Sequence, residues 1–366
     1  RNLLSGNDFG RRPHPLVSFV HAPRSDLGPA VPSCQNSLAH IAGRRFASPV
    51  IPGREIVVLR RLADYLVYLV VRVLICVVQA ITIEAGHRAA KFLAWLFADV
   101  IRLRAAVVED NLAHAFPDLD PAQRQRRARQ MWEHLFLLAI EVAHAPRKIH
   151  ETNWREYVQL INDDRLLRHT LSERPTILLS GHFGNFEVAG YVLGLMGFHT
   201  YAVARNLDNP YLHRFITRFR GLTGQFIIPK NDAYEQLLWA ADQGKTLAFL
   251  GDQYAGSKGC WVDFFGRPAS THKAIALFAL EHQAPMVVSY ARRLGKPLHF
   301  ELKAVAFHDP REAASDVNSI KELTQWYTSH LEDIIRLAPE QYWWVHRRWK
   351  DTRAKERARR KKATAA

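Results

Sequence analysis

One segment of this chain is more informative than any other: Thr176-Ile-Leu-Leu-Ser-Gly-His-Phe-Gly-Asn-Phe-Glu-Val-Ala-Gly190. Residues Thr176–Leu179 are apolar and partly β-branched, which predicts a short buried strand. Two glycines interrupt the strand, and the run at 185–196 then predicts a helix. The segment therefore predicts a strand, a tight turn and a helix, the unit from which α/β sheets are built.

The predicted turn carries a histidine, and the helix that follows carries a carboxylate. On one continuous helix, His182 and Glu187 would face different sides, but a turn between them lets their side chains converge. A neutral imidazole titrates near ~6.5, and a nearby carboxylate raises that pKa. Such a base can take a proton from an alcohol that attacks an acyl carbon. The alternatives for an isolated His-x4-Glu pattern are a helix cap, a core histidine and a surface ion pair.

Strands and helices alternate along the rest of the chain. Further strands are predicted at Thr200–Ala204, Phe226–Pro229, Thr246–Leu250, Met286–Tyr290 and Leu298–Val305. Helices are predicted at Asn185–Leu195, Tyr211–Gly221, Ala233–Gln243 and Thr271–His282. This alternation predicts an α/β fold with a central sheet flanked by helices. Ligands bind such sheets at the strand ends, where His182 and Gly251-Asp-Gln253 are both expected.

The composition divides the 366 residues into four regions. Residues 1–53 are rich in Pro, Gly, Ser and Arg, which predicts disorder. We expect a membrane-associated helical region at 54–110, the main domain at 111–350 and a basic tail at 351–366. Three cysteines without metal-ligand spacing predict a reduced, cytosol-facing protein and no metal site.

The segment Tyr65–Ile83 is the most apolar part of the chain. Twelve of its residues are Leu, Ile or Val, and Arg72 is its one charge. The twelve favour membrane insertion by ~5 kcal/mol in total, and a central Arg opposes it by ~3 kcal/mol. We therefore expect a membrane-embedded or interfacial helix, with a buried core helix as the alternative.

The net charge of +15 is concentrated at the C-terminus. Residues 347–362 contain ten Lys or Arg against two acidic side chains. Such a tail can bind nucleic acid, anionic lipid or an acidic protein, and a solvated terminus is the alternative. Near an anionic leaflet, each basic residue contributes ~1 kcal/mol of binding.

Several other polar residues are candidate ligand contacts. Arg205 follows a predicted strand and can direct a planar guanidinium at a phosphate or a carboxylate. Asn209 belongs to the turn that comes next. Arg214 and Arg218 share one helix face, which favours an anionic ligand or solvent as their partner. Asp252 can orient a basic group, bind a hydroxyl or stabilise a turn.

Two aromatic segments remain open to more than one interpretation. The paired Phe264 and Phe265 can line an acyl pocket or pack in the core. The segment Pro339–Trp349 combines three Trp with basic residues, which suits a membrane–water boundary or a buried closing helix.

Together these segments resemble the bacterial lipid A biosynthesis acyltransferase family, the late lauroyl and myristoyl transferases of lipopolysaccharide assembly. The matching segments occur in the family's order and are His182-Phe-Gly-Asn-Phe-Glu187, Arg205-x-x-Asp-Asn-Pro210, Gly251-Asp-Gln253, Phe264-Phe-Gly266 with Thr271, and Pro339-Glu-Gln-Tyr-Trp-Trp-Val-His-Arg-Arg348. The resemblance covers about residues 60 to 350.

The resemblance implies an acyltransferase on the cytoplasmic face of the bacterial inner membrane, anchored by the helix near residues 65–83. It implies an acyl donor on acyl carrier protein, or on CoA, and a hydroxyl acceptor on a phosphorylated glycolipid. Acyl carrier protein is acidic, which suits a basic enzyme. No metal and no cofactor are implied.

The resemblance also implies roles for individual residues. His182 is the expected general base, and Glu187 orients it and stabilises the imidazolium. Arg205 is expected to stabilise the oxyanion or hold a lipid phosphate. Asp252 is expected to contact substrate. Apart from the resemblance, Asn209 and Arg218 are further candidate substrate contacts.

Two other functions remain as alternatives. The same fold can acylate another membrane lipid, such as a mannosylated phosphoinositide, an aminolipid or a glycerophospholipid. A different class is a membrane-surface or nucleic-acid-binding protein that uses the basic tail. For the acyltransferase we expect no nucleic-acid partner.

Overall fold

The structure is a computed structural model that describes residues 54–161, 163–229, 233–312 and 317–350. The regions predicted at 1–53 and 351–366 lie outside the described residues. The described chain consists of a helical N-terminal part followed by a sheet with helices on both faces.

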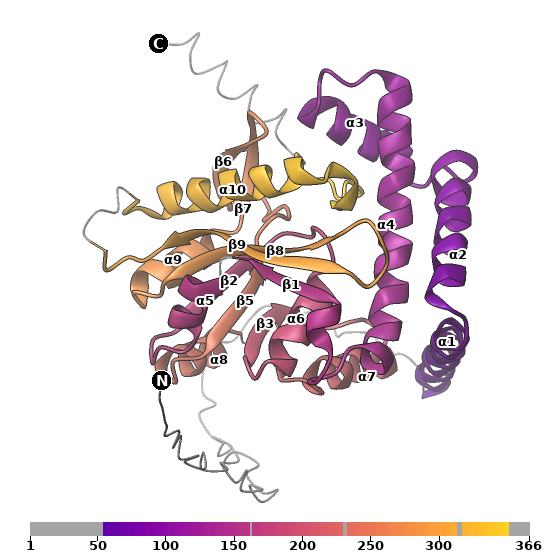
Figure 1. The fold of residues 1–366 in the computed structure, drawn as a ribbon, viewed down its shortest axis with the longest axis horizontal. Helices are drawn as coiled ribbons and strands as arrows, with labels where there is room; N and C mark the ends of the chain where they lie inside the picture. Colours follow the sequence, from indigo (N-terminus) through magenta and orange to yellow (C-terminus); the bar gives the residue numbers. More distant parts are fainter. Residues whose placement is uncertain (1–53, 162, 230–232, 313–316, 351–366) are drawn as a thin grey trace, which may run out of the picture. The chain divides into compact units, whose positions relative to one another are not determined.

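A seven-stranded mixed sheet lies at the centre (Figure 1). Its order is β1 (Val158–Ile161), β9 (Phe300–His308), β8 (Met286–Arg293), β2 (Thr176–Ser180), β5 (Thr246–Leu250), β3 (Thr200–Ala204) and β4 (Gln225–Pro229). All neighbours pair in parallel except β8 and β9, which are antiparallel. The α/β fold with a mixed sheet is therefore confirmed, and all six predicted strands are present. Strand β1 was not predicted.

Helices cover both faces of this sheet. They are α5 (Asp163–Thr170), α6 (Phe186–Leu195), α7 (Pro210–Gly221), α8 (Ala233–Asp242), α9 (Lys273–Glu281) and α10 (Ile320–Leu337). Alternate residues of the central strand β2 face opposite layers. Leu179 packs in the main core with α8, α9 and α10. Leu178 packs on the other face with side chains of α5 and α6. Figure 1 shows α10 and α6 on opposite sides of the sheet.

The N-terminal part is helical. It contains α1 (Arg54–Ala80), α2 (Ile83–Trp95), a π-helical turn η1 (Leu96–Val100), α3 (Ala105–Ala115) and α4 (Pro121–Lys148). Helix α4 begins with a capping box in which Asp120 and Gln123 satisfy each other's backbone N–H groups. Helix α2 runs along α4, and α1 lies near the C-terminal end of α4 (Figure 1).

Helix α1 exposes its apolar side chains instead of burying them. Residues Val58–Ala80 form a helix that is long and apolar enough to cross a membrane, and none of its most apolar window is buried. Its contacts with the main domain include an aromatic cluster of Tyr65 and Tyr68 of α1 with Tyr211 and Phe215 of α7. The alternative of a buried core helix is therefore wrong.

The segment before α9 differs from expectation. The residues leading to α9 form a hairpin of β6 (Cys260–Phe264) and β7 (Arg267–Thr271), whose turn places Phe265 at φ 52° and Gly266 at φ 70°. Both Phe264 and Phe265 pack in the core. Short 3-10 helices lie at Trp154–Glu156 and Pro339–Gln341.

The segment after Gln341 is neither a closing helix nor a membrane boundary. No α-helix is present between Gln341 and Lys350. Trp344 and Trp349 are buried in the core, so their rings cannot lie at a lipid surface. The segment instead lies against the residues described next.

Candidate active site

Two adjacent parallel strands bring His182 and Asp252 together. Strand β2 pairs with β5 so that Ser180 is opposite Leu250, the last residue of each strand. His182 and Asp252 each lie two residues beyond that pair. They therefore meet at the carboxyl edge of the sheet, where α/β proteins bind their ligands.

Asp252 holds His182 through two hydrogen bonds. The imidazole Nδ1 donates to Oδ1 at 2.8 Å, and the His182 backbone N–H donates to Oδ2 at 2.9 Å. The Asp252 side chain is buried, and its two oxygens fix both the ring and the loop that carries it. Because an ionised carboxylate only accepts hydrogen bonds, Nδ1 carries the proton and Nε2 presents a lone pair in the neutral ring.

The pair shifts both pKa values. Burial alone lowers the pKa of His182, but the charge of Asp252, its hydrogen bond and the charge of Glu187 together raise the pKa above its usual 6.5. Burial raises the pKa of Asp252, but the charge and hydrogen bonds of His182 outweigh burial and hold it well below its usual range. A histidine oriented by a carboxylate is the arrangement of a general base.

Glu187 does not contact the imidazole in the structure. Helix α6 begins at Phe186, so Glu187 lies in its first turn and faces α7. There Arg220 binds it with two hydrogen bonds, one of them between Nε and Oε2 at 3.0 Å. The expectation that Glu187 orients His182 is corrected, since Asp252 occupies that position. Glu187 still acts on His182 through its charge.

The turn between His182 and α6 requires its glycine and its asparagine. Gly184 has a φ of 58°, and a Cβ there would lie 1.8 Å from the carbonyl oxygen of Ala291. Asn185 caps α6 by accepting from the backbone N–H of Val188 at 3.1 Å. Its own backbone N–H donates to Ala291 at 2.8 Å. The contacts with Ala291 of β8 therefore hold the turn in place, and the turn determines where α6 begins.

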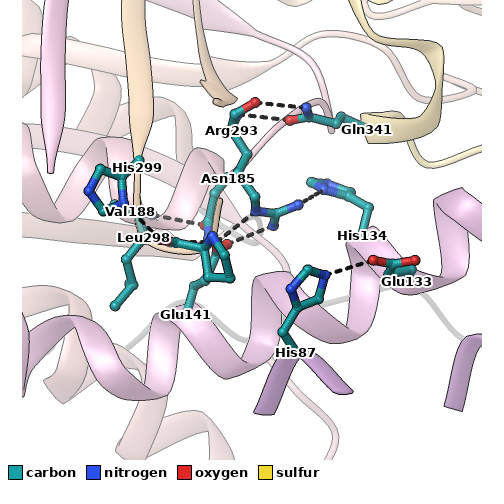
Figure 2. Close-up of polar contacts among 11 residues, drawn as sticks. His87, Glu133, His134, Glu141, Asn185, Val188, Arg293, Leu298, His299 and Gln341 are labelled. Carbon is teal, nitrogen blue, oxygen red and sulfur yellow. Dashed lines mark hydrogen bonds and ion pairs between the residues drawn. The ribbon is translucent and has the colours of Figure 1, made fainter. Parts of the chain in front are cut away.

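A buried ion pair supports the same turn from α4 (Figure 2). Glu141 has no exposed side-chain surface, and it accepts from Nε and Nη2 of Arg293, each at 2.6 Å. Glu141 also accepts from Nδ2 of Asn185 at 2.9 Å and from the backbone N–H of Leu298 at 3.0 Å. Arg293 contacts Nδ1 of His134 at 2.8 Å. Burial and the charge of Arg293 hold the pKa of His134 well below its usual range.

Sequence reasoning missed this pair, although one signal was present. Glu141 is the only charged residue in the apolar run at 135–142 of α4. A buried carboxylate in such a run needs a cation and hydrogen-bond donors. Its partner Arg293 lies 152 positions later, at the end of β8, and no sequence pattern connects the two.

The C-terminal segment closes over the histidine. The backbone N–H of Trp343 donates to the carbonyl of His182 at 3.1 Å, and the two rings lie 4.8 Å apart. Gln341 accepts from the backbone N–H of Gly184 at 2.9 Å through its carbonyl. Its side-chain amide pairs with the backbone of Arg293, as Figure 2 shows. These contacts and those of Asp252 together fix the loop that carries His182.

A largely apolar cavity of about 660 Å³ reaches His182. It lies between the sheet and helices α5 and α6, with Leu166, Leu178, Leu193 and Ala304 among its walls. His182, Glu187 and Gln253 also line it. Ligand cavities typically measure 300–1,000 Å³ and combine apolar walls with few polar groups.

Two other predicted contacts, Arg205 and Asn209, differ in their placement. Arg205 lines the cavity, is largely exposed and pairs with Asp208 at 2.8 Å. Asn209 caps α7 and donates to the Asp64 carbonyl of α1 at 2.7 Å. These bonds use the amide oxygen and one amide N–H, so Asn209 connects α7 to α1, and its role as a substrate contact stays a prediction.

Asp252 is corrected to a residue that holds His182, whereas the role of Arg218 as a substrate contact stays a prediction. Both oxygens of Asp252 are used by His182. Arg218 is exposed and does not line the cavity that the described residues form, whereas Arg220 does. Within the described ranges, no group of three or more His, Cys, Asp or Glu side chains is placed to hold a metal ion.

The comparisons with known proteins agree on one family. The family model "Bacterial lipid A biosynthesis acyltransferase" matches residues 55–351. The lipid A biosynthesis palmitoleoyltransferase of Escherichia coli (strain K12) is 26% identical over 260 residues, covering 68% of this chain and 80% of that protein. The lipid A biosynthesis lauroyltransferase of the same organism is 24% identical over 259 residues, with the same coverage of both proteins.

A solved structure is also similar. The 1-acyl-sn-glycerophosphate acyltransferase of Thermotoga maritima matches 70% of this chain and 98% of its own, at 13% identity and a TM-score of 0.33. The family model spans far more than half of the chain and includes every residue of the site described above. This chain therefore belongs to the bacterial lipid A biosynthesis acyltransferase family and is an enzyme that transfers acyl groups.

Proposed function

We propose that this enzyme transfers a fatty acyl chain from a thioester on acyl carrier protein to a hydroxyl group of a lipid A precursor, with His182 as the general base. The observation that carries the proposal is the His182–Asp252 pair at the end of an apolar cavity. A base beside an apolar cavity can activate a hydroxyl next to a bound acyl chain.

The chemistry follows from the protonation of the ring. Nε2 of His182 takes the proton from the acceptor hydroxyl as its oxygen attacks the thioester carbonyl. The imidazolium is stabilised by Asp252 at 2.8 Å and by the charge of Glu187. When the tetrahedral intermediate collapses, the C–S bond breaks and the leaving thiolate takes the proton from the imidazolium. The reaction needs no covalent acyl-enzyme.

Substrate placement follows from the cavity walls. The apolar walls between the sheet and α5 and α6 suit the acyl chain, whose thioester then lies beside His182. Arg205 lies at the same cavity with its guanidinium largely exposed, which suits an anionic group such as a lipid phosphate. The two substrates would thus approach His182 from an apolar side and a polar side.

Membrane attachment follows from α1. Its exposed apolar residues, including Leu62, Leu66, Val70 and Leu74, would lie in hydrocarbon. An acceptor that is itself a membrane lipid then needs to diffuse only in the plane of the bilayer. We propose the cytoplasmic face of the inner membrane as the location, since acyl carrier protein is available there.

The direct test is lipid A mass spectrometry. We would express the wild type, His182→Ala and the exposed control His150→Ala in a Gram-negative host that lacks its late acyltransferases. The wild type and the control should add one acyl mass, and His182→Ala should add none. The same gain with His182→Ala would refute the base assignment.

The donor and the acceptor need a second assay. Purified enzyme in detergent should acylate a lipid A precursor faster with acyl-acyl carrier protein than with acyl-CoA. A preference for CoA would refute the proposed donor. Acylation of total lipid but not of the precursor would point to another membrane lipid as the acceptor.

A further inference from the structure

The second ring nitrogen of His182 is covered by a glutamine. The side-chain amide nitrogen of Gln253 lies 3.2 Å from Nε2 of His182. Asp252 and Gln253 are consecutive residues after β5, so one short segment contacts both nitrogens of the ring. Asp252 holds Nδ1, and Gln253 covers Nε2.

The direction of this hydrogen bond follows from Asp252. Its carboxylate accepts the Nδ1 proton, so the neutral ring has only a lone pair at Nε2. The amide N–H of Gln253 must then be the donor. In the structure, the amide N–H of Gln253 therefore donates to the Nε2 lone pair of His182. General-base catalysis requires that lone pair to be free.

An acceptor hydroxyl must displace Gln253 before it can react. The hydroxyl has to donate to Nε2 at hydrogen-bond distance, where the amide now lies. The freed amide remains in the same cavity wall as His182, since both line it. Its N–H groups then lie beside the acyl carbon, where the carbonyl oxygen gains negative charge.

The other expected donor is less well placed. Arg205 has a side chain that is 77% exposed, and it pairs with Asp208. It contacts no atom of His182 among the interactions of the described residues. Oxyanion stabilisation needs a donor close to the reacting carbonyl in a site that excludes water, and Gln253 contacts His182 directly. That criterion favours Gln253.

We propose that Gln253 is a catalytic residue with two successive contacts, covering Nε2 of His182 in the free enzyme and donating to the oxyanion once the acceptor hydroxyl has displaced it. The proposal rests on the proposed function. In the step, the hydroxyl oxygen bonds to the carbonyl carbon and its proton moves to Nε2. The carbonyl π pair moves to the oxygen that Gln253 then binds, and it returns when the C–S bond breaks.

The test is a steady-state comparison of full-length variants in detergent. Gln253→Ala should lower kcat by about 10²- to 10³-fold, the effect of removing one oxyanion donor, with KM for both substrates little changed. Gln253→Glu keeps the shape of the side chain but presents a carboxylate near the oxyanion, so it should lower kcat further. The exposed Gln243→Ala is the matched control and should behave as wild type. Arg205→Ala should instead raise KM for the acceptor.

A binding measurement separates catalysis from folding. An alkyl phosphonate has a tetrahedral phosphorus in place of the reacting carbon and carries negative oxygens on it, so it should bind Gln253→Ala more weakly by about the factor lost in kcat. A fatty alcohol of equal length should bind both proteins equally. If Gln253→Ala fails to fold, the near-isosteric Gln253→Glu decides by the same two readouts.

The outcomes distinguish this proposal from the proposed function. If His182→Ala abolishes the reaction while both Gln253 variants keep kcat within a few-fold, the oxyanion role is overturned and the base assignment stands. A loss through KM alone, with phosphonate binding unchanged, also overturns it. If His182→Ala retains activity, the proposed function itself is refuted.

Discussion

Two groups of residues hold His182 in different ways. We call the contacts made by Asp252 after β5 the strand side, and the contacts made by α6 and the residues that support it the helix side. On the strand side, Asp252 follows β5 and contacts the ring and its backbone directly. On the helix side, Glu187 lies on α6 and pairs with Arg220, and the helix itself is held through Asn185 by Glu141. The strand side therefore has the larger effect on the protonation of the proposed base, and the helix side adds the smaller charge effect of Glu187 and supports the turn that follows His182.

The largest expected effect tests the strand side. Asp252→Asn should lower kcat by about 10³- to 10⁴-fold, because an amide can stabilise the wrong tautomer and cannot stabilise the imidazolium. Asp242→Asn, an exposed change of the same kind, is the control for acyl transfer measured with purified enzyme. Activity within tenfold of wild type would show that Asp252 is only structural.

The next effect tests how the helix side is held. Glu141→Gln should lower the free energy of unfolding by about 3–5 kcal/mol, because it leaves the buried charge of Arg293 without a full partner. Denaturant titration of the detergent-solubilised protein measures this, with the exposed Glu151→Gln as control. Equal stability of the two variants would contradict a supporting role for the pair.

A smaller effect tests the charge on the helix side. Glu187→Gln should lower kcat about tenfold, since one charge near the imidazolium contributes roughly 1–2 kcal/mol at an effective dielectric of ~20. The loss should fall well below that of Asp252→Asn in the same acyl-transfer assay. A larger loss than for Asp252→Asn would reverse the ranking of the two sides and restore Glu187 as the main partner.

The smallest effect is a shift along the pH axis. The raised pKa of His182 places the acid limb of kcat/KM above pH 6.5 in the wild type, since the base works only when neutral. In Asp252→Asn, no carboxylate opposes the effect of burial, so the pKa of His182 should fall. The acid limb should then lie at a lower pH than in the wild type. The limb of Glu187→Gln should lie between them. Coincident limbs would show that the two carboxylates do not control the base.

Much of the fold could be predicted because its signals are local. The apolar runs of β2, β3 and β5 each lie within a few residues of sequence, and the strands predicted from them were confirmed. The hairpin β6–β7 was missed because Phe265 adopts the positive φ that usually marks glycine or asparagine. Strand β1 was missed because its four residues carry too little pattern.

The candidate site was less predictable because its contacts depend on strand order. The sequence placed His182 on the right turn but paired it with the carboxylate nearest in sequence. Its partner Asp252 lies 70 positions away and is adjacent only because β5 lies beside β2. The role of Arg220, as opposed to Arg218, depended on which face of α7 is turned toward α6.

The contact between α1 and α7 has a consequence for how the enzyme selects lipids. Asn209 and the aromatic rings of Tyr65 and Tyr211 fasten α1 to α7, and α7 reaches Glu187 through Arg220. If α1 lies in the bilayer as proposed, the reactive nitrogen of His182 sits at a fixed height relative to the hydrocarbon boundary. The enzyme would then select an acceptor by how deep its hydroxyl group lies in the bilayer, as well as by the chemistry of that group.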